Sequence, residues 1–221
     1  MVDYVSQVVL SFNADATITR GDENISNKAT KNGTTNTVVP LGNPPLLLDS
    51  VRDSEVQAVK VAITGAKAPW RLYLTGHGDW ENQTLGGWSS ISVLALLKAA
   101  GLKSVDTVSV TGCSLGRDLG KAGEHRIACS VDSFAGRIHS GLQSVCGVST
   151  ILHARVFDVN RSSADGRKTT GNAPGQGLEW IGAVNKRDYS KLTFKWIDGR
   201  QRRFWSYSGE STAKDEIMSL Y

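Results

Sequence analysis

The chain has 221 residues and a formal net charge of +4, with 40% hydrophobic and 21% charged residues. This length and composition are ordinary for a globular protein and fit one sizeable domain, or one domain with an appendage. No apolar run is long enough to cross a bilayer, and the N-terminus lacks a basic start followed by an apolar stretch. We therefore expect neither a transmembrane segment nor a signal peptide in this chain.

The three cysteines are Cys113, Cys129 and Cys146, an odd number without C-x-x-C spacing. This pattern argues against a disulfide framework and against a zinc site, so we expect reduced thiols and no metal. Basic residues crowd between Arg155 and Arg203. Such crowding suggests an anionic partner, although a solvated basic face is the simpler alternative.

The first third of the chain has mixed signals. Residues 6–12 predict a short strand, and the polar residues 13–37 predict a helix broken by loops. Residues 38–48 contain three prolines and cannot form a regular central strand, because each proline removes a donor from the ladder. Residues 54–65 fit either a helix or a strand.

A βαβ unit follows. The β-rich residues 70–75 stop at His77, and residues 105–111 stop at Cys113; both His77 and Cys113 follow a glycine directly. Between them, residues 89–100 have good helix formers after a serine-rich start. Such a crossover makes the two strands parallel, so that their carboxyl ends meet at one edge of the sheet, where open α/β sheets place ligands.

The remainder of the chain predicts one more helix and several strands. In order, these are a helix over 123–141, a strand over 147–160, a turn-rich loop over 160–177, an antiparallel pair over 179–184 and 191–196, and a tight turn at 198–199 into a strand over 202–207. The last dozen residues fit a short helix or a tail.

His77 and Cys113 are the candidate catalytic pair. A thiol is a useful nucleophile as its thiolate, and a neighbouring imidazole can take the proton. The backbone N–H groups of Gly78 and Cys113 are the candidate donors to an oxyanion. Alone, a buried thiol or a Gly-His-Gly turn is the commoner reading, and for Cys129 and Cys146 we expect structural burial. Both residues together at the ends of neighbouring parallel strands favour catalysis.

Three stretches carry a family resemblance: Thr75-Gly76-His77-Gly78, Leu85-Gly86-Gly87-Trp88 and Val108-Ser109-Val110-Thr111-Gly112-Cys113-Ser114-Leu115. They resemble the self-processing cysteine protease domain of MARTX and large clostridial glucosylating toxins, in the caspase-like clan. The resemblance implies an α/β fold, with a mostly parallel sheet flanked by helices and a C-terminal β-flap. We expect a protease domain over residues 1–197, with the flap near 178–197, and an extension over 198–221.

The same resemblance implies a His77/Cys113 dyad and activation by inositol hexakisphosphate. The residues that match the family's anion site are Arg167, Lys168 and Lys186, with Lys28 or Lys31 matching an N-terminal lysine more loosely. Because converging cations repel one another until an anion arrives, the ligand is expected to order the flap and the active site. Arg200, Arg202 and Arg203 do not align, and they either extend the site, bind other phosphates or solubilise the chain.

Two questions stay open at this point. A third residue assisting His77 is unassigned, with Asp15 and Asp53 as candidates. Leu85 and Trp88 either line the substrate cleft or pack in the core.

The resulting hypothesis is a cysteine endopeptidase that is an autoprocessing toxin module or an effector protease, secreted or injected by a bacterium and acting in the host cytosol. Its expected partners are a protein substrate, either its own polypeptide or a host protein, and an inositol phosphate, with no nucleic acid. The alternatives are a catalytically silent caspase-like module that binds a polyanion or a protein partner, and an acyltransferase or ligase that uses the same dyad.

Overall fold

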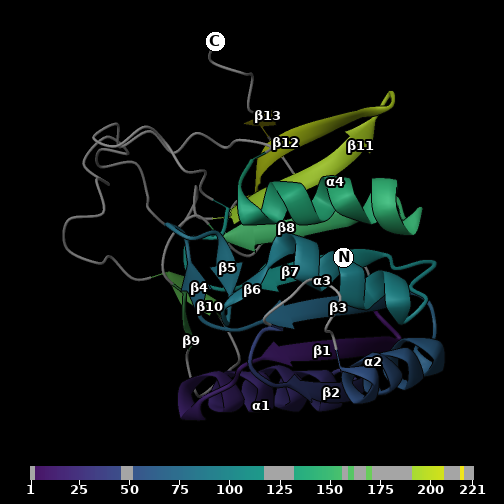
Figure 1. Ribbon diagram of the computed structural model, residues 1–221, viewed down its shortest axis with the longest axis vertical. Coiled ribbons are helices and arrows are strands. Elements are labelled where there is room, and N and C mark those ends of the chain that lie inside the picture. Colours follow the sequence, from purple (N-terminus) through teal and green to yellow (C-terminus); the bar gives the residue numbers. More distant parts are fainter. Residues whose placement is uncertain are drawn as a thin grey trace.

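The computed structural model describes residues 3–45, 52–116, 132–155, 159–161, 168–170, 191–206 and 215–216. Within these residues the main feature is an eight-stranded sheet (Figure 1). Its strands in spatial order are β13 (Asp215–Glu216), β12 (Arg200–Ser206), β11 (Lys191–Ile197), β8 (Ile151–Arg155), β7 (Thr107–Thr111), β3 (Trp70–Thr75), β1 (Ser6–Phe12) and β2 (Thr35–Leu41). The strands from β8 to β2 are parallel, whereas β11, β12 and β13 pair antiparallel. The predicted α/β fold with a mostly parallel sheet is confirmed.

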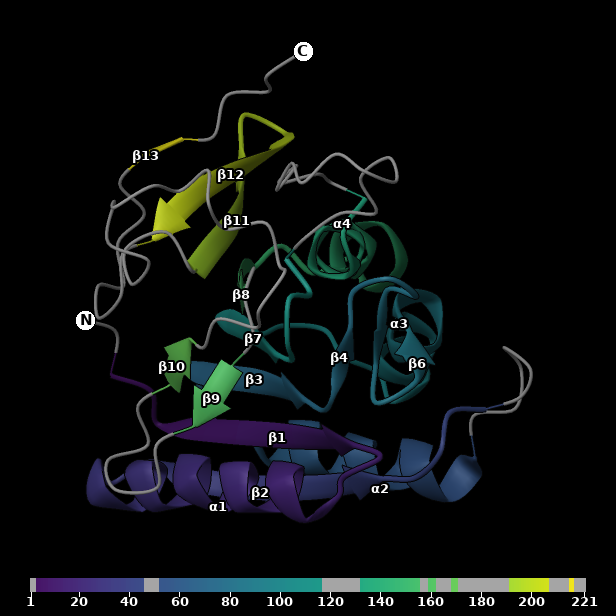
Figure 2. The same ribbon diagram turned by 90° about the vertical axis from the view of Figure 1, so that its left-hand side faces the viewer.

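Helices cover both faces of this sheet. The described helices are α1 (Ala16–Lys31), α2 (Asp53–Gly65), α3 (Ser90–Ala99) and α4 (Phe134–Cys146). Helix α1 packs on one face at β1 and β2, where Gln7 donates to the Ile25 carbonyl. Helices α2, α3 and α4 pack together on the other face, and α3 and α4 lie to the right in Figure 2.

Alternation along the strands explains this layering. In β3, Trp70, Leu72 and Leu74 are buried in the main hydrophobic core, whereas Arg71 and Tyr73 point to the opposite face. Each fully buried aliphatic or aromatic side chain contributes about 1.5–3 kcal/mol to folding. The sheet therefore has an apolar face under α2, α3 and α4 and a more polar face on the side of α1.

The predicted βαβ unit is confirmed as β3, α3 and β7. Strands β3 and β7 pair in parallel with Thr75 opposite Thr111. The Ser89 hydroxyl caps α3 by accepting the Ser92 N–H at 3.1 Å.

The proline-containing segment forms an edge strand. Strand β2 pairs only with β1 among the described strands, and it includes Pro40, which lies opposite Ser11. The prediction that residues 38–48 form no central strand therefore agrees with the structure. Within the polar stretch before it, α1 is a single helix, and residues 54–65 lie in the helix α2.

The predicted bounds of the second helix are wrong. Helix α4 runs through Gly141 to Cys146 and ends at Gly147, whose φ is 70°. Gly141 marks a close helix contact rather than a helix end, because a methyl group there would collide with Leu94 of α3. Residues 123–131 of the predicted helix lie outside the described residues.

One further prediction needs correction, and another is not tested. The predicted loop over 160–177 contains a two-stranded antiparallel ribbon of β9 (Val159–Arg161) and β10 (Lys168–Thr170). The predicted strand over 179–184 and most of the expected flap lie outside the described residues. Strand β11 pairs with β8 and β12, and the predicted tight turn stands at Asp198 and Gly199, with φ of 51° and 71°.

Candidate active site

The carboxyl ends of β3 and β7 bring the candidate pair to one edge of the sheet. Thr75 pairs with Thr111, and the Gly76 N–H donates to the Thr111 carbonyl at 3.4 Å. His77 and Cys113 follow at matching positions, on neighbouring strands that lie about 4.8 Å apart. A small sheet of β4 (Gly78–Asp79), β5 (Thr84–Leu85) and β6 (Trp88–Ser89) begins immediately after His77, on the left in Figure 1.

The backbones beside the two candidate residues touch. A methyl group at Gly78 would collide with the Cys113 carbonyl oxygen and lie 2.5 Å from its backbone nitrogen. Glycine at position 78 is therefore required for this approach. The contact brings together the two main-chain segments expected to supply the oxyanion donors.

The turn that carries Cys113 is fixed on its far side by two main-chain hydrogen bonds. Ser114 has a φ of 56° and begins a sharp turn. The Leu115 carbonyl accepts from Ala135 of α4 at 3.1 Å, and the Gly116 N–H donates to the Arg155 carbonyl of β8 at 2.7 Å. The turn that carries Cys113 is thus attached to both a helix and a strand.

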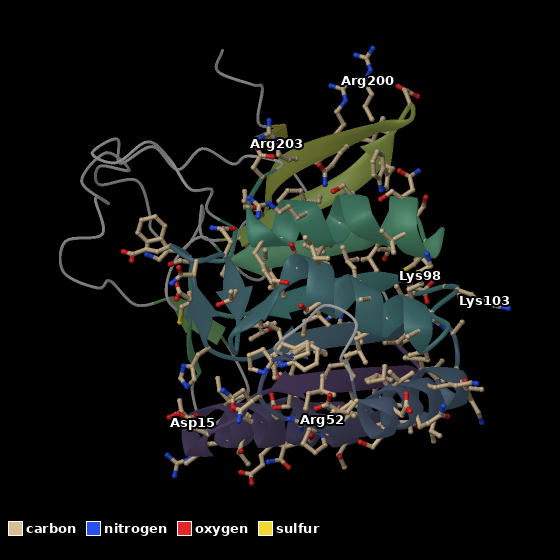
Figure 3. All side chains as sticks on the ribbon, in the orientation of Figure 1. Asp15, Arg52, Lys98, Lys103, Arg200 and Arg203 are labelled. Atoms are coloured by element: carbon tan, nitrogen blue, oxygen red, sulfur yellow. The ribbon has the colours of Figure 1, made fainter. Side chains whose placement is uncertain are left out.

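Asp15 holds the imidazole of His77. The His77 Nε2 and Asp15 Oδ2 atoms lie 2.9 Å apart, and the two side chains are 57% and 55% exposed. The other carboxylate oxygen caps α1 by accepting the N–H groups of Thr17 and Ile18, each at 2.9 Å. The Ile18 N–H and then the His77 ring hold the pKa of Asp15 below its usual value. Figure 3 shows Asp15 at the lower left of the view.

Asp15 and Asp53 were the two open candidates for a third residue. Asp53 is the exposed first residue of α2, where an acidic residue favours the helix N-terminus. Asp15 is the one that the structure places against His77.

The model of the Peptidase C80 family matches residues 3–170. The chain belongs to the peptidase C80 family. This is the family of the MARTX and clostridial toxin cysteine protease domains, so the chain is a cysteine endopeptidase. No curated protein matches the chain.

In this peptidase C80 chain, Leu85 and Trp88 belong to the core. Both side chains are 0% exposed, so packing is the role that the structure shows for them. The Leu85 Cδ1 atom would lie 2.7 Å from a methyl group at Gly112, directly before Cys113. Trp88 packs edge-on against Phe12 at 5.4 Å and donates its indole N–H to the Gly42 carbonyl at 3.0 Å. These residues support the site from beneath.

The residues expected at the anion site are only partly described. Lys28 and Lys31 lie in the last turn of α1, and Lys168 begins β10, where the side chain is outside the description. Arg167 and Lys186 lie outside the described residues, as does Cys129. Cys146 ends α4, and burial raises the pKa of its thiol.

Sequence reasoning missed a basic cluster on the polar face of the sheet. Lys191 of β11 lies directly opposite Arg155 of β8. Burial, followed by the charges of Arg155 and Arg71, lowers the pKa of Lys191 to about 8. Lys191 therefore lies close enough to the cations of two other strands, Arg155 and Arg71, to be repelled by both.

Arg71 is held in this cluster by aromatic rings. Its Cζ atom lies 4.1 Å from the ring centre of Tyr4 and 5.5 Å from that of Tyr73, and Nη1 donates to the Tyr73 hydroxyl at 3.0 Å. Its Nε atom is buried and has no hydrogen-bond partner among the described residues. The sequence feature that could have identified Arg71 is a charged residue in an alternating strand, at a position that faces away from the core.

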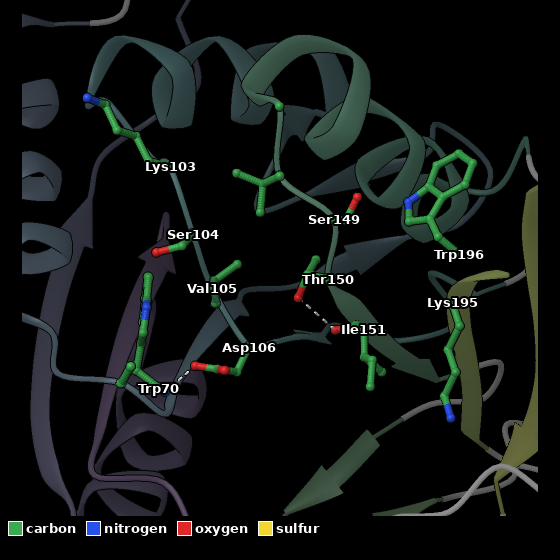
Figure 4. A pocket seen from close by; sticks show the side chains of 13 residues that line it. Trp70, Lys103, Ser104, Val105, Asp106, Ser149, Thr150, Ile151, Lys195 and Trp196 are labelled. Carbon is green, nitrogen blue, oxygen red and sulfur yellow. Dashed lines mark hydrogen bonds between the residues drawn. The ribbon is translucent and has the colours of Figure 1, made fainter. Parts of the chain in front are cut away.

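A separate cleft of about 610 Å³ opens at the opposite edge of the sheet (Figure 4). It lies at the amino ends of β3, β7 and β8, where Asp106 accepts the Trp70 N–H at 2.7 Å. Lys103 lines it, and Figure 3 shows Lys103 and Asp15 on opposite sides of the molecule. The cleft is therefore remote from the candidate dyad.

Metal-binding clusters and membrane-spanning helices are both absent from the described ranges. These ranges contain no cluster of three or more histidine, cysteine, aspartate or glutamate side chains suited to a metal ion. No described helix is long and apolar enough to span a membrane.

Proposed function

We propose that this cysteine endopeptidase uses Cys113 as its nucleophile, His77 as its general base and Asp15 as the group that orients His77. The observation that carries the proposal is the hydrogen bond from His77 to Asp15 at the sheet edge where Gly78 touches Cys113. A base oriented by a third group beside a thiol is the usual arrangement for nucleophilic catalysis.

Each residue has one chemical task in this mechanism. Asp15 accepts the N–H of His77 Nε2, which leaves Nδ1 to take the Cys113 proton. The thiolate attacks the peptide carbonyl, and the N–H groups of Gly78 and Cys113 stabilise the resulting oxyanion. His77 returns its proton to the leaving amine, and a water molecule then hydrolyses the thioester.

Replacement of the thiol tests this assignment. We expect Cys113→Ala to abolish peptide cleavage with unchanged circular dichroism, and Cys146→Ala to keep the activity. An activity-based thiol probe, followed by mass analysis, should label Cys113. Full cleavage by Cys113→Ala, or labelling of Cys129 in its place, would refute the assignment.

We also propose that inositol hexakisphosphate activates the enzyme. The binding residues in this proposal are Arg167, Lys168 and Lys186, with Lys28 or Lys31, joined by Arg71, Arg155 and Lys191. The lowered pKa of Lys191 supports this, because cations that repel one another are stabilised when several phosphates converge on them. The ligand supplies negative charge and order to the fold and takes no part in peptide chemistry.

Calorimetric titration tests the anion site. We expect Arg167→Ala together with Lys168→Ala to weaken binding of inositol hexakisphosphate at least about 10-fold, which is the loss of 1.4 kcal/mol or more. Lys103→Ala removes a charge at the opposite edge of the sheet and should leave the affinity unchanged. Equal affinity of the double variant and the parent chain would rule the site out.

Membership of the peptidase C80 family supports a proposal for the setting of the reaction. We propose a toxin autoprocessing module or effector protease, secreted or injected by a bacterium, that cleaves its own polypeptide or a host protein in the host cytosol. A catalytically silent binding module, the alternative considered from the sequence, would show no thiol-dependent cleavage. Analysis of the products separates hydrolysis from acyl transfer or ligation.

A further inference from the structure

We propose that Arg155 is a positioning residue that joins the anion site to the nucleophile, through the hydrogen bond from the Gly116 N–H to its carbonyl. This inference rests on the proposed activation by inositol hexakisphosphate and names the route by which the anion reaches the thiol. Both ends of this route belong to Arg155. Its side chain lies in the basic cluster, and its carbonyl accepts a hydrogen bond from the turn that carries Cys113.

The side chain of Arg155 lies beside another cation. Arg155 is the last residue of β8 and lies opposite Lys191 in the antiparallel ladder. Cβ atoms of such directly opposed residues are about 5 Å apart, and like charges there destabilise the pairing. An anion bound between the two side chains removes this repulsion and firms the end of β8.

The main-chain end reaches the nucleophile within three residues. The Gly116 N–H donates to the Arg155 carbonyl at 2.7 Å, which is a short bond for an amide donor. Leu115 is fully buried, and its Cδ1 would lie 2.8 Å from a methyl group at Gly112. The segment from Gly112 to Gly116 is therefore tightly packed, and a displacement of Gly116 is transmitted to Cys113.

The second hydrogen bond that holds the turn serves as an internal control for the first. Ala135, at the start of α4, donates to the Leu115 carbonyl at 3.1 Å. Helix α4 packs on the apolar face of the sheet, away from Arg155 and Lys191. One attachment of the catalytic turn is thus independent of the anion, while the other responds to it.

Substitution of Gly116 separates binding of the anion from its effect. Gly116→Pro removes the N–H donor, whereas the matched control Gly116→Ala keeps it; Gly116 is not among the glycines with positive φ. The affinity for inositol hexakisphosphate is measured by calorimetry, and the rate of Cys113 alkylation by iodoacetamide is measured with and without the anion. In the parent and in Gly116→Ala we expect the anion to raise this rate about 5- to 150-fold, the usual range of allosteric coupling.

In Gly116→Pro we expect an affinity within about threefold of the parent and a rate increase below about twofold. A parent-like rate increase in Gly116→Pro overturns the route through Arg155 while leaving activation by the anion intact. Failure of the parent chain to bind the anion overturns the proposed activation itself, and with it this inference.

Hydrogen exchange at Gly116 gives a second readout that needs no proline. We expect inositol hexakisphosphate to slow exchange of the Gly116 amide at least about 10-fold in the parent, with a much smaller effect in Arg155→Met. The Ala135 amide, which bonds to Leu115, should respond equally little in both chains. Equal slowing at Gly116 in Arg155→Met and the parent would overturn the proposal.

Discussion

Asp15 forms hydrogen bonds both within the fold and with the proposed general base. One carboxylate oxygen caps α1, and the other accepts from His77. The cap fixes the position of the carboxylate relative to the helix, so the helix end sets the orientation of the imidazole. Both side chains are about half exposed, so solvent screens the attraction between their charges. The orientation of the imidazole therefore depends on the hydrogen-bond geometry more than on burial.

A pair of substitutions separates the two roles of Asp15. Asp15→Ser retains a helix cap but is too short to reach His77, whereas Asp15→Ala removes both interactions. We expect both variants to lose about 10- to 100-fold in kcat/KM, because the imidazole is no longer oriented. Only Asp15→Ala should lower the Tm, by about 2–4 °C. Parent-like kcat/KM in Asp15→Ser would contradict the orienting role.

Local patterns predicted His77 and Cys113 as the candidate pair, because each follows an apolar run and a glycine. They could not choose between Asp15 and Asp53, since that choice depends on where a helix far along the chain begins. Leu85 and Trp88 were also ambiguous, because a loop sequence does not tell which apolar residues fold inward. Arg71 was missed because a single charge in a strand gives no indication of the cations on neighbouring strands.

Among the elements, α4 is tied to the end of the sheet through a buried histidine. His139 is fully buried; Nδ1 accepts from Gln201 of β12 at 2.8 Å, and Nε2 donates to the Thr150 carbonyl at 3.0 Å. Its ring stacks on Trp196 of β11 at 5.4 Å. This arrangement uses the neutral imidazole, and burial lowers the pKa of His139 to about 4.

The free energy of unfolding in mild acid should report the contact that His139 makes between α4 and the strands β11 and β12. The unfolded chain binds a proton on His139 below about pH 6.5, whereas the folded chain resists protonation down to about pH 4. The contribution of His139 is therefore complete above pH 6.5 and declines by about 3 kcal/mol as the pH falls to 4. Urea unfolding at several pH values measures the decline, and His139→Phe provides the control.

A decline of the same steepness in His139→Phe would contradict this account.

The elements also show why glycine alone misleads a prediction of helix ends. Gly141 and Gly147 both suggested boundaries, yet the first permits contact between α3 and α4, and only the second ends the helix. The distinction depends on a neighbouring helix and is invisible in the local sequence.

At the scale of the whole molecule, the two faces of the sheet differ in polarity and charge. The apolar face is covered by three helices and holds the core, while the polar face carries the basic cluster of Arg71, Arg155 and Lys191. The βαβ pattern predicted the parallel pairing of β3 with β7, and the family resemblance implied the mostly parallel sheet around them. The antiparallel strands were harder, because β11 pairs with a strand that precedes it by a long stretch of chain.

Binding of a polyanion should stabilise the whole fold. Inositol hexakisphosphate at 100 times its Kd is expected to raise the free energy of unfolding by about 2.7 kcal/mol at pH 7. At a fixed ligand concentration the gain should shrink toward pH 9, because Lys191 loses its charge near pH 8. Thermal unfolding with and without the ligand measures the gain.

Without the ligand, a rise in pH changes the free energy of unfolding in the opposite direction through Lys191. Between about pH 8 and 10.5 the unfolded chain binds more protons at Lys191 than the folded chain, so this residue makes the unliganded fold more stable as the pH rises. Lys191→Met should remove most of the pH dependence of the ligand effect, whereas Lys103→Met should not. A gain that is equal at pH 7 and pH 9 in the parent would count against Lys191 as a ligand contact.

Pro40 has a consequence for how copies of the protein meet. An edge strand offers its outward N–H and C=O groups to any other strand, which is a common start of aggregation. Since β2 keeps its pairing with β1, the nitrogen of Pro40 faces outward and provides no donor there. A second chain that added itself along β2 would lack one bond in the middle of the ladder. The same residue that excluded a central strand thus helps to keep neighbouring molecules apart.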